Sequence, residues 1–281
     1  MPSSVAALLP RGPACSVAKG DLRRRHACLI LLLVVNCTQQ EAPRAEPKIV
    51  AAPQREPETP KLTALTGEWI EHRGDGWFIP PLGATEARPL VVAIHGAGDR
   101  PEWACAEWRD ITNAYAVISC PHGDVFGAGY AWSSVEQLEE RARSAELDAR
   151  ARYGAYVDPK PPILVGFSQG ARLASIIARK HPDRWPVVAL VEGGYDETKW
   201  GFGPAFAKGG KRVLFACSTW HCADGFRDGE RSSIAAKVDA RVADLGNLGH
   251  HMGDPVRAGL RAQFRWLVHD DERWEAWLES P

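Results

Sequence analysis

Short apolar runs alternate with amphipathic segments along the chain from residue 66 onward. The run over residues 89–94 is apolar without interruption, which is typical of a strand buried on both faces of a sheet. Five further runs are interpreted in the same way, over residues 115–120, 162–167, 187–191, 212–217 and 240–245. Trp69 and residues 77–79 indicate an antiparallel hairpin before them.

Between these runs, apolar positions recur at helical spacing. Three faces of this kind consist of Val135, Leu138, Ala142, Ala145 and Ala149; Leu173, Ile176 and Ile177; and Val256, Leu260, Phe264, Leu267 and Val268. Ser133 and Glu136 have the spacing of a capping box at the start of the first helix. Strands and helices that alternate in this way predict a single α/β domain, with a mostly parallel central sheet and helices on both faces.

The first 61 residues have a different character and are excluded from this domain. A basic cluster over residues 23–26 precedes an apolar run over residues 27–35, which is too short to span a bilayer and has the pattern of an export signal. The run ends at Asn36-Cys37, which resembles the lipobox of bacterial lipoproteins, although Asn36 departs from the usual small residue. Residues 38–61 carry five prolines among small and charged residues and predict an extended linker.

We therefore expect an export signal over residues 1–37, a linker over 38–61 and a folded domain over 62–281. The protein would be exported to the periplasm or cell surface, and a lipidated Cys37 would tether it to the membrane. Signal cleavage without a lipid is the alternative. The long segment before the basic cluster also leaves open a start codon downstream of Met1.

The formal net charge of −1 provides no electrostatic basis for binding nucleic acid. Cys15 and Cys28 would leave with the signal, so the exported domain would keep four cysteines, which persist as disulfides in oxidising compartments. Of the three possible pairings, proximity in sequence favours Cys105–Cys120 and Cys217–Cys222. A metal site at Cys217, His221 and Cys222 is the competing interpretation, but no further ligands stand at a usual spacing.

The main chemical signal is Gly166-Phe167-Ser168-Gln169-Gly170, a GxSxG motif between a predicted strand and a predicted helix. A serine on such a turn is a nucleophile elbow, where small neighbours permit close approach and the helix N-terminus stabilises negative charge. With this motif and the order of the others, residues 66–268 resemble the α/β-hydrolase superfamily. The pattern is nearest to carboxylesterases, dienelactone hydrolases and polyester depolymerases.

The resemblance implies roles for two further motifs. Residues 94–99 close the first buried strand, where the family places its oxyanion loop, so the backbone N–H groups of Ala97 and Gln169 would form the oxyanion hole. The Gly249-His250 pair follows the last strand and resembles the family's catalytic histidine, with His251 as the alternative.

Three alternatives are open for the acid of the triad. The family normally places it after the strand over residues 213–217, where Asp224 is the nearest carboxylate if the cysteine loop folds back. Asp196, after the preceding strand, is the second candidate, and a dyad without an acid is the third.

The resemblance implies a serine hydrolase that cleaves a small-molecule or polymer ester through an acyl-enzyme on Ser168, with no metal or organic cofactor. A serine peptidase of the same fold and an inactive binding lipoprotein are the alternatives. Phe126, Tyr130 and Trp132 are candidates for lining the substrate pocket, and residues 270–281 are a candidate extension of the last helix. The oligomeric state is not indicated.

Overall fold

The computed structural model describes residues 61–74, 76–199 and 201–280, which belong to one compact unit. The predicted export signal over residues 1–37 and the linker up to residue 60 lie outside the described residues. Within the described part, one α/β domain surrounds a mostly parallel sheet, as the alternating pattern predicts.

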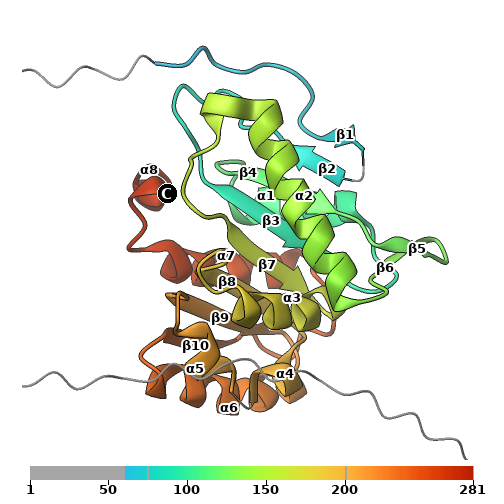
Figure 1. Ribbon diagram of the computed structural model, residues 1–281, viewed down its shortest axis with the longest axis vertical. Coiled ribbons are helices and arrows are strands. Elements are labelled where there is room, and N and C mark those ends of the chain that lie inside the picture. Colours follow the sequence, from blue (N-terminus) through green and yellow to red (C-terminus); the bar gives the residue numbers. More distant parts are fainter. Residues whose placement is uncertain (1–60, 75, 200, 281) are drawn as a thin grey trace, which may run out of the picture. The chain divides into compact units, whose positions relative to one another are not determined.

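The central sheet contains eight strands in the order β1-β2-β4-β3-β7-β8-β9-β10 (Figure 1). In chain order they are β1 (Glu71–Arg73), β2 (Gly76–Ile79), β3 (Leu90–Ile94), β4 (Val117–Pro121), β7 (Ile163–Phe167), β8 (Val187–Val191), β9 (Arg212–Cys217) and β10 (Asp239–Asp244). β1 and β2 form the predicted antiparallel hairpin, and β2 pairs antiparallel with β4. The strands β4, β3, β7, β8, β9 and β10 are parallel to one another. The carboxyl ends of these parallel strands therefore share one edge of the sheet.

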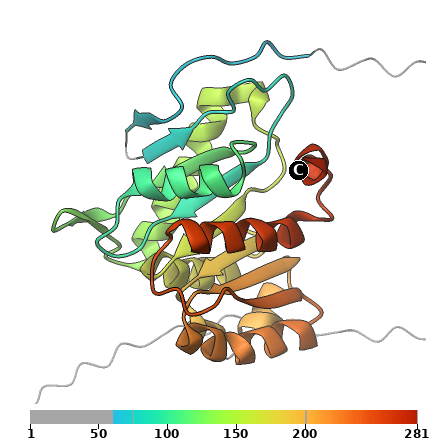
Figure 2. The ribbon, with the colours of Figure 1, turned by 180° about the vertical axis from the view of Figure 1, so that it is seen from behind.

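Helices cover both faces of the sheet because alternate side chains of each central strand point in opposite directions. Helices α2 (Val135–Tyr153), α3 (Gln169–Lys180), α5 (Phe202–Phe206) and α6 (Trp220–Ala235) pack on one face, against side chains such as Val92 and Leu164. Helices α1 (Pro101–Ile111) and α7 (Asp254–Val268) pack on the other, against Val91 and Val165 (Figure 2). A short helix α4 (Tyr195–Lys199) follows β8.

The strands differ in how far they are buried. The central strand β3 is fully buried, as its uninterrupted apolar run predicts. β10 is instead an edge strand, and only its Ala243 is buried. Its polar positions Asp239, Arg241 and Asp244 are exposed, which is tolerated because β10 is the outermost strand of the sheet in the described part of the chain.

Two local predictions are corrected. The N-cap of α2 is Ser134 and not Ser133, because the Ser134 hydroxyl accepts a hydrogen bond from the Gln137 N–H at 3.1 Å. The C-terminal segment does not extend α7 but turns through a 3₁₀ helix (Glu272–Trp274) into α8 (Glu275–Glu279). The segment turns back because Trp274 and Trp277 bury their rings against Phe264 of α7.

Both favoured disulfides are present, Cys105–Cys120 and Cys217–Cys222. The first joins α1 to β4, and the second joins the end of β9 to the first turn of α6. Disulfides of this kind are typical of proteins from oxidising compartments. No helix among the described residues is long and apolar enough to span a membrane.

Candidate active site

Ser168 occupies the turn between β7 and α3 in a strained backbone conformation, with φ of 52° and ψ of −119°. A positive φ is costly for a residue with a side chain, by about 1–3 kcal/mol, and persists only where the surrounding structure enforces it. The turn places Ser168 at the carboxyl edge of the sheet and at the N-terminus of the 12-residue helix α3. The partial positive charge at that end of the helix favours negative charge beside the serine.

Close backbone packing around the serine requires three glycines. A Cβ on Gly166 would lie 2.8 Å from the backbone nitrogen of Ala171, and one on Gly170 would lie 2.5 Å from the carbonyl oxygen of His95. A Cβ on Gly193, after β8, would lie 2.2 Å from the carbonyl oxygen of Ser168. The two glycines of the motif therefore serve the tight turn and its contact with the loop after β3.

His250 lies beside Ser168. Its Nε2 is 2.9 Å from the Ser168 Oγ, so the serine hydroxyl can donate to the imidazole. The Phe167 ring packs beside the His250 ring, with centroids 5.0 Å apart. The neighbouring His251 is turned away, and its Nδ1 accepts a hydrogen bond from the Gly253 N–H within its own loop. Of the two histidines, only His250 is brought to the serine.

The other nitrogen of His250 faces a glutamate. Its Nδ1 lies 3.2 Å from Oε2 of Glu192, the residue that directly follows β8. The Glu192 side chain is only 2% exposed, whereas that of His250 is 52% exposed. A serine, an imidazole and a buried carboxylate therefore form one continuous chain of hydrogen bonds.

The Glu192 carboxylate is held by the residues after β9. It accepts hydrogen bonds from the Ser218 N–H and, at 2.9 Å, from the Thr219 hydroxyl. Burial acts to raise the pKa of Glu192, but the hydrogen bonds from His250, Thr219 and Ser218 outweigh it, and the net pKa is lowered. Glu192 is thus held as an anion where an adjacent imidazolium would be stabilised.

Ser218 also holds the histidine loop in place. Its carbonyl oxygen accepts hydrogen bonds from the N–H groups of Leu248 and Gly249, and its hydroxyl donates to the Gly249 carbonyl at 2.7 Å. One fully buried serine therefore connects Glu192 to the backbone that carries His250.

The sequence-based choice of Asp224 for the acid is corrected by this geometry. The chain enters α6 at Trp220, with Thr219 as the N-cap, and the helix directs Asp224 to the exposed surface. The second candidate, Asp196, is also exposed and pairs with Lys199. The sequence signal for Glu192 was a carboxylate at the end of a buried strand, directly before two glycines.

Ala97 and Gln169 lie on the two segments that meet at Ser168. Ala97 follows β3 in the loop that contacts the elbow, and Gln169 is the first residue of α3. Among the described residues, neither backbone N–H donates a hydrogen bond to another protein group. Both are therefore available as donors to an external oxygen.

An open cavity of about 260 Å³ adjoins the serine and the histidine. Its lining consists of Ser168, Gln169, Arg172, Glu192, Gly193, Gly194, Tyr195, Asp196, Glu197 and His250. The three aromatic candidates for the pocket do not contribute to this lining. Trp132 is buried against His95, while Phe126 is exposed on the hairpin of β5 (Asp124–Phe126) and β6 (Gly129–Ala131), and Tyr130 packs beside His122.

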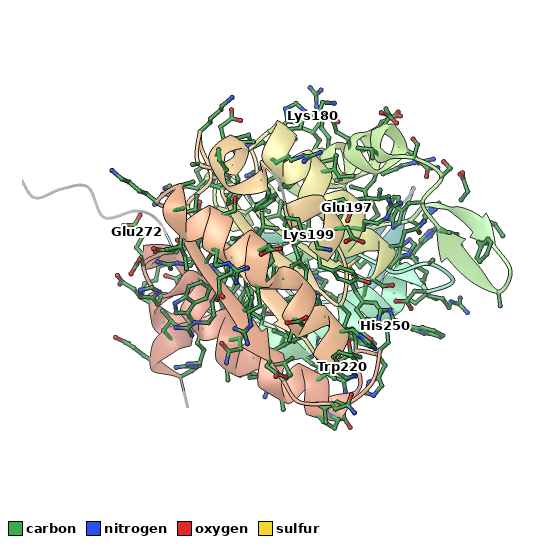
Figure 3. The ribbon with its side chains drawn as sticks, turned by 90° about the horizontal axis from the view of Figure 1, so that it is seen from below. Lys180, Glu197, Lys199, Trp220, His250 and Glu272 are labelled. Carbon is green, nitrogen blue, oxygen red and sulfur yellow. A yellow bond between two sulfur atoms is a disulfide. The ribbon has the colours of Figure 1, made fainter. Side chains whose placement is uncertain are left out.

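Figure 3 shows Glu272 at one end of the domain and His250 towards the other, and the β5–β6 hairpin projects from the same end as His250. This end corresponds to the carboxyl edge of the parallel strands. The residues that surround the serine thus come from the loops after β3, β7, β8 and β10.

The competing metal site is not supported by the donor atoms. Glu192, Cys217 and Cys222 have ligand-type atoms within 4.8 Å of one another. However, the two sulfur atoms are bonded to each other and offer no thiolate, and the carboxylate already accepts hydrogen bonds from the Ser218 N–H, the Thr219 hydroxyl and His250 Nδ1.

No protein-family model and no curated protein matches this sequence. Several solved structures do match. An uncharacterized protein from Bacillus cereus is 14% identical, with 65% of this chain and 60% of that chain covered and a TM-score of 0.52. Esterase PE8 is 22% identical over 65% of this chain and 94% of its own, with a TM-score of 0.47.

The carboxylesterase of Bacillus cereus is 15% identical over 65% of this chain and 88% of its own, again with a TM-score of 0.47. At such identities the likeness concerns the fold. The likeness to the uncharacterized protein, whose TM-score exceeds 0.5, agrees with the single α/β domain and mostly parallel sheet described above.

Proposed function

We propose that this protein is a serine hydrolase that cleaves carboxylic esters through an acyl-enzyme on Ser168. The observation that carries the proposal is the chain of hydrogen bonds from Ser168 Oγ to His250 Nε2, at 2.9 Å, and from His250 Nδ1 to Glu192 Oε2, at 3.2 Å. A nucleophile, a base and an orienting carboxylate in this geometry are what acyl transfer requires.

The reaction proceeds in two steps. His250 Nε2 removes the hydroxyl proton as Ser168 Oγ attacks the ester carbonyl carbon, and the carbonyl oxygen becomes an oxyanion held by the Ala97 and Gln169 N–H groups. His250 then returns the proton to the leaving alcohol, which leaves Ser168 acylated. In the second step, His250 takes a proton from water, the hydroxide attacks the acyl carbon, and the proton returns to Ser168 as the carboxylic acid departs.

Glu192 would stabilise the imidazolium that forms in each step and keep the proton of the neutral imidazole on Nδ1. The lack of a well-placed acid in the sequence favoured a binding lipoprotein that had lost catalysis. A buried glutamate with a lowered pKa beside His250 removes that argument and supports the enzyme.

The dimensions of the cavity support a short group next to the ester bond. The cavity volume of about 260 Å³ is less than the roughly 300–1,000 Å³ that encloses a drug-sized ligand, so most of a larger substrate would lie outside the cavity.

Exposed apolar side chains also follow the strands at this edge of the sheet: Trp103 after β3, Val125 and Phe126 after β4, Trp220 after β9, and Leu248 after β10. They support an ester whose bulk is apolar, as a small molecule or as part of a polymer.

The decisive experiment is hydrolysis of p-nitrophenyl acetate and butyrate by the protein and its Ser168→Ala, His250→Ala and His251→Ala variants. We expect the first two to lose about 10³-fold or more in kcat and the third to match the wild type. A fluorophosphonate should label the wild type and not Ser168→Ala. An unlabelled, inactive wild type would support the binding protein, and cleavage of peptide amides in preference to esters would support the peptidase.

Export and a lipid on Cys37 belong to the same proposal. The two disulfides support an oxidising compartment. Expression in a Gram-negative host with labelled palmitate tests the tether, because Cys37→Ser should abolish labelling and release the protein from membranes. Labelling that persists in the variant would contradict a lipid on Cys37.

A further inference from the structure

The two oxyanion donors lie on separate segments, and their separation must be controlled. Ala97 belongs to the loop after β3, whereas Gln169 begins α3. A misplacement of about 1 Å at a reacting centre can reduce the rate by about 10²-fold. Some contact must therefore fix one segment relative to the other, and the described residues include one.

The side chain of Gln169 pairs with the backbone of Trp132. The Trp132 N–H donates to Oε1 of Gln169 at 3.0 Å, and Nε2 of Gln169 donates to the Trp132 carbonyl at 3.0 Å. Two antiparallel hydrogen bonds restrain both position and rotation, as in a strand pair. The side-chain amide of Gln169 is therefore bonded to Trp132, while the backbone N–H of Gln169 remains available as the proposed donor to the oxyanion.

The same short segment also holds the loop of Ala97. The Trp132 indole N–H donates to the carbonyl oxygen of His95 at 3.0 Å, and its ring stacks on the imidazole with centroids 4.8 Å apart. Two residues earlier, Tyr130 forms a pair of 2.8 Å backbone hydrogen bonds, one from the Gly98 N–H and one to the Asp99 carbonyl. The loop is thus attached on both sides of Ala97.

His95 completes this arrangement as a neutral, fully buried side chain. Its Nε2 accepts a hydrogen bond from the Gly123 N–H at 3.2 Å, so its proton lies on Nδ1, which donates to the Gly96 carbonyl at 2.7 Å. Burial lowers the pKa of His95, which is consistent with an acceptor at Nε2. The His95 imidazole, 28 positions from Gly123 in sequence, therefore links the loop after β3 to the residues after β4.

We infer that residues 130–132, here called the bracing segment, set the distance between the Ala97 and Gln169 N–H groups. The Gln169 amide, the Trp132 indole and the His95 imidazole act as positioning residues for the oxyanion hole. The inference rests on the proposed ester hydrolysis. Because an oxyanion is present only in the transition state and the intermediate, loosening the segment should lower kcat with little change in KM.

Gln169→Met tests the inference because it keeps the length of the side chain and the backbone N–H but removes both bonds to Trp132. Trp132→Phe tests the other side, because it keeps a stacked ring and removes the bond to His95. We expect each to lower kcat for p-nitrophenyl butyrate by about 10- to 100-fold at nearly constant KM. The affinity for phenylboronic acid, whose adduct with serine is tetrahedral, should fall by a similar factor.

Gln137→Met is the matched control. The Gln137 Oε1 accepts a hydrogen bond from the Ser133 N–H at 2.9 Å, one residue beyond the bracing segment, and among the described residues the Gln137 side chain forms no hydrogen bond to the segments of Ala97 and Gln169. We expect its kcat and boronate affinity to match the wild type. An equal loss in Gln137→Met would overturn the inference, since it would show that the effect comes from general loosening.

The outcomes also separate this inference from the function on which it depends. If the wild type hydrolyses the ester, is labelled by the fluorophosphonate, and both Gln169→Met and Trp132→Phe retain wild-type kcat while folded by circular dichroism, the bracing role is wrong and the proposed function stands. If the wild type is neither active nor labelled, the proposed function itself fails. A rise in KM alone would place Gln169 in substrate binding and would also overturn the inference.

Discussion

The buried carboxylate of Glu192 lies 3.2 Å from Nδ1 of His250, on the side of the imidazole opposite Ser168. Glu192 follows β8 and His250 follows β10, so the pair joins two strands that are separated in the sheet by β9. Ser218 and Thr219, which follow the intervening strand β9, donate hydrogen bonds to the Glu192 carboxylate.

Glu192→Gln should reduce kcat by about 10³- to 10⁴-fold with a small effect on KM, because an amide cannot stabilise the imidazolium and favours the wrong tautomer of His250. Steady-state kinetics with p-nitrophenyl butyrate measures this. Asp224→Asn is the control and should retain wild-type kcat, since Asp224 is exposed on α6. The reverse result would restore Asp224 as the acid.

The Cys217–Cys222 disulfide should support activity as well as stability. It encloses Ser218 and Thr219, which hold Glu192, so replacing both cysteines by serine should lower kcat by roughly 10-fold and stability by about 2 kcal/mol. Replacing Cys105 and Cys120 should cost about 3 kcal/mol, because that loop is longer, and leave kcat unchanged. Urea denaturation and kinetics at a temperature where all variants are folded measure the two effects. Equal kcat values for the two double variants would contradict this role.

Gly193→Ala should inactivate and destabilise the protein by about 2 kcal/mol or more, because its Cβ would lie 2.2 Å from the Ser168 carbonyl oxygen, and backbone atoms there cannot move independently. Gly76→Ala provides the comparison, since its nearest Cβ contact is an ordinary 3.5 Å. Thermal denaturation and esterase assays should separate the two variants clearly. A fully active Gly193→Ala would show that the elbow tolerates a shift of its backbone.

Ser168→Gly should be more stable than Ser168→Ala by about 1 kcal/mol, although both should be inactive. The positive φ of 52° strains any residue with a Cβ, and glycine relieves this strain while losing some entropy on folding. The free energy of unfolding in urea measures the difference. Equal stabilities would mean that the turn stores no strain at this residue.

Glu107 should make stability depend on pH in the neutral range. Burial, with the nearby Asp99 carboxylate, raises the pKa of Glu107 to about 8, whereas the value in the unfolded chain is about 4.3. Between these values the folded protein binds a proton that the unfolded chain has released, so stability declines as pH rises from about 4.5 towards 8.

Glu107→Gln removes this titration. The difference in unfolding free energy between the variant and the wild type should therefore grow in favour of the variant by roughly 1–3 kcal/mol between pH 5 and pH 9. Urea denaturation at several pH values measures it. Curves that stay parallel across this range would contradict a raised pKa for Glu107.

Local sequence patterns determined the main strands and helices of this protein, the turn that carries Ser168 and the pairing of the cysteines. The fully apolar run of β3 and the helical spacing of Leu173 and Ile177 reflect burial, which acts on each element separately and leaves a periodic trace in the sequence. The GxSxG motif likewise points to Ser168 as the proposed nucleophile, because such a turn needs glycines within a few residues of the serine. The disulfide pairing follows from proximity along the chain.

Only the tertiary structure decided which carboxylate meets His250 and what holds together the segments of Ala97 and Gln169, the two proposed oxyanion donors. Glu192 is 58 positions from His250, and Trp132 is 37 positions from Gln169, so no short spacing records either contact. Both contacts depend on where the parallel strands end along a shared edge of the sheet. Asp224 is closer to His250 in sequence than Glu192 is, but α6 directs it away from that edge. Contacts between distant segments leave no periodic signal in one sequence, because each partner alone is compatible with many neighbours.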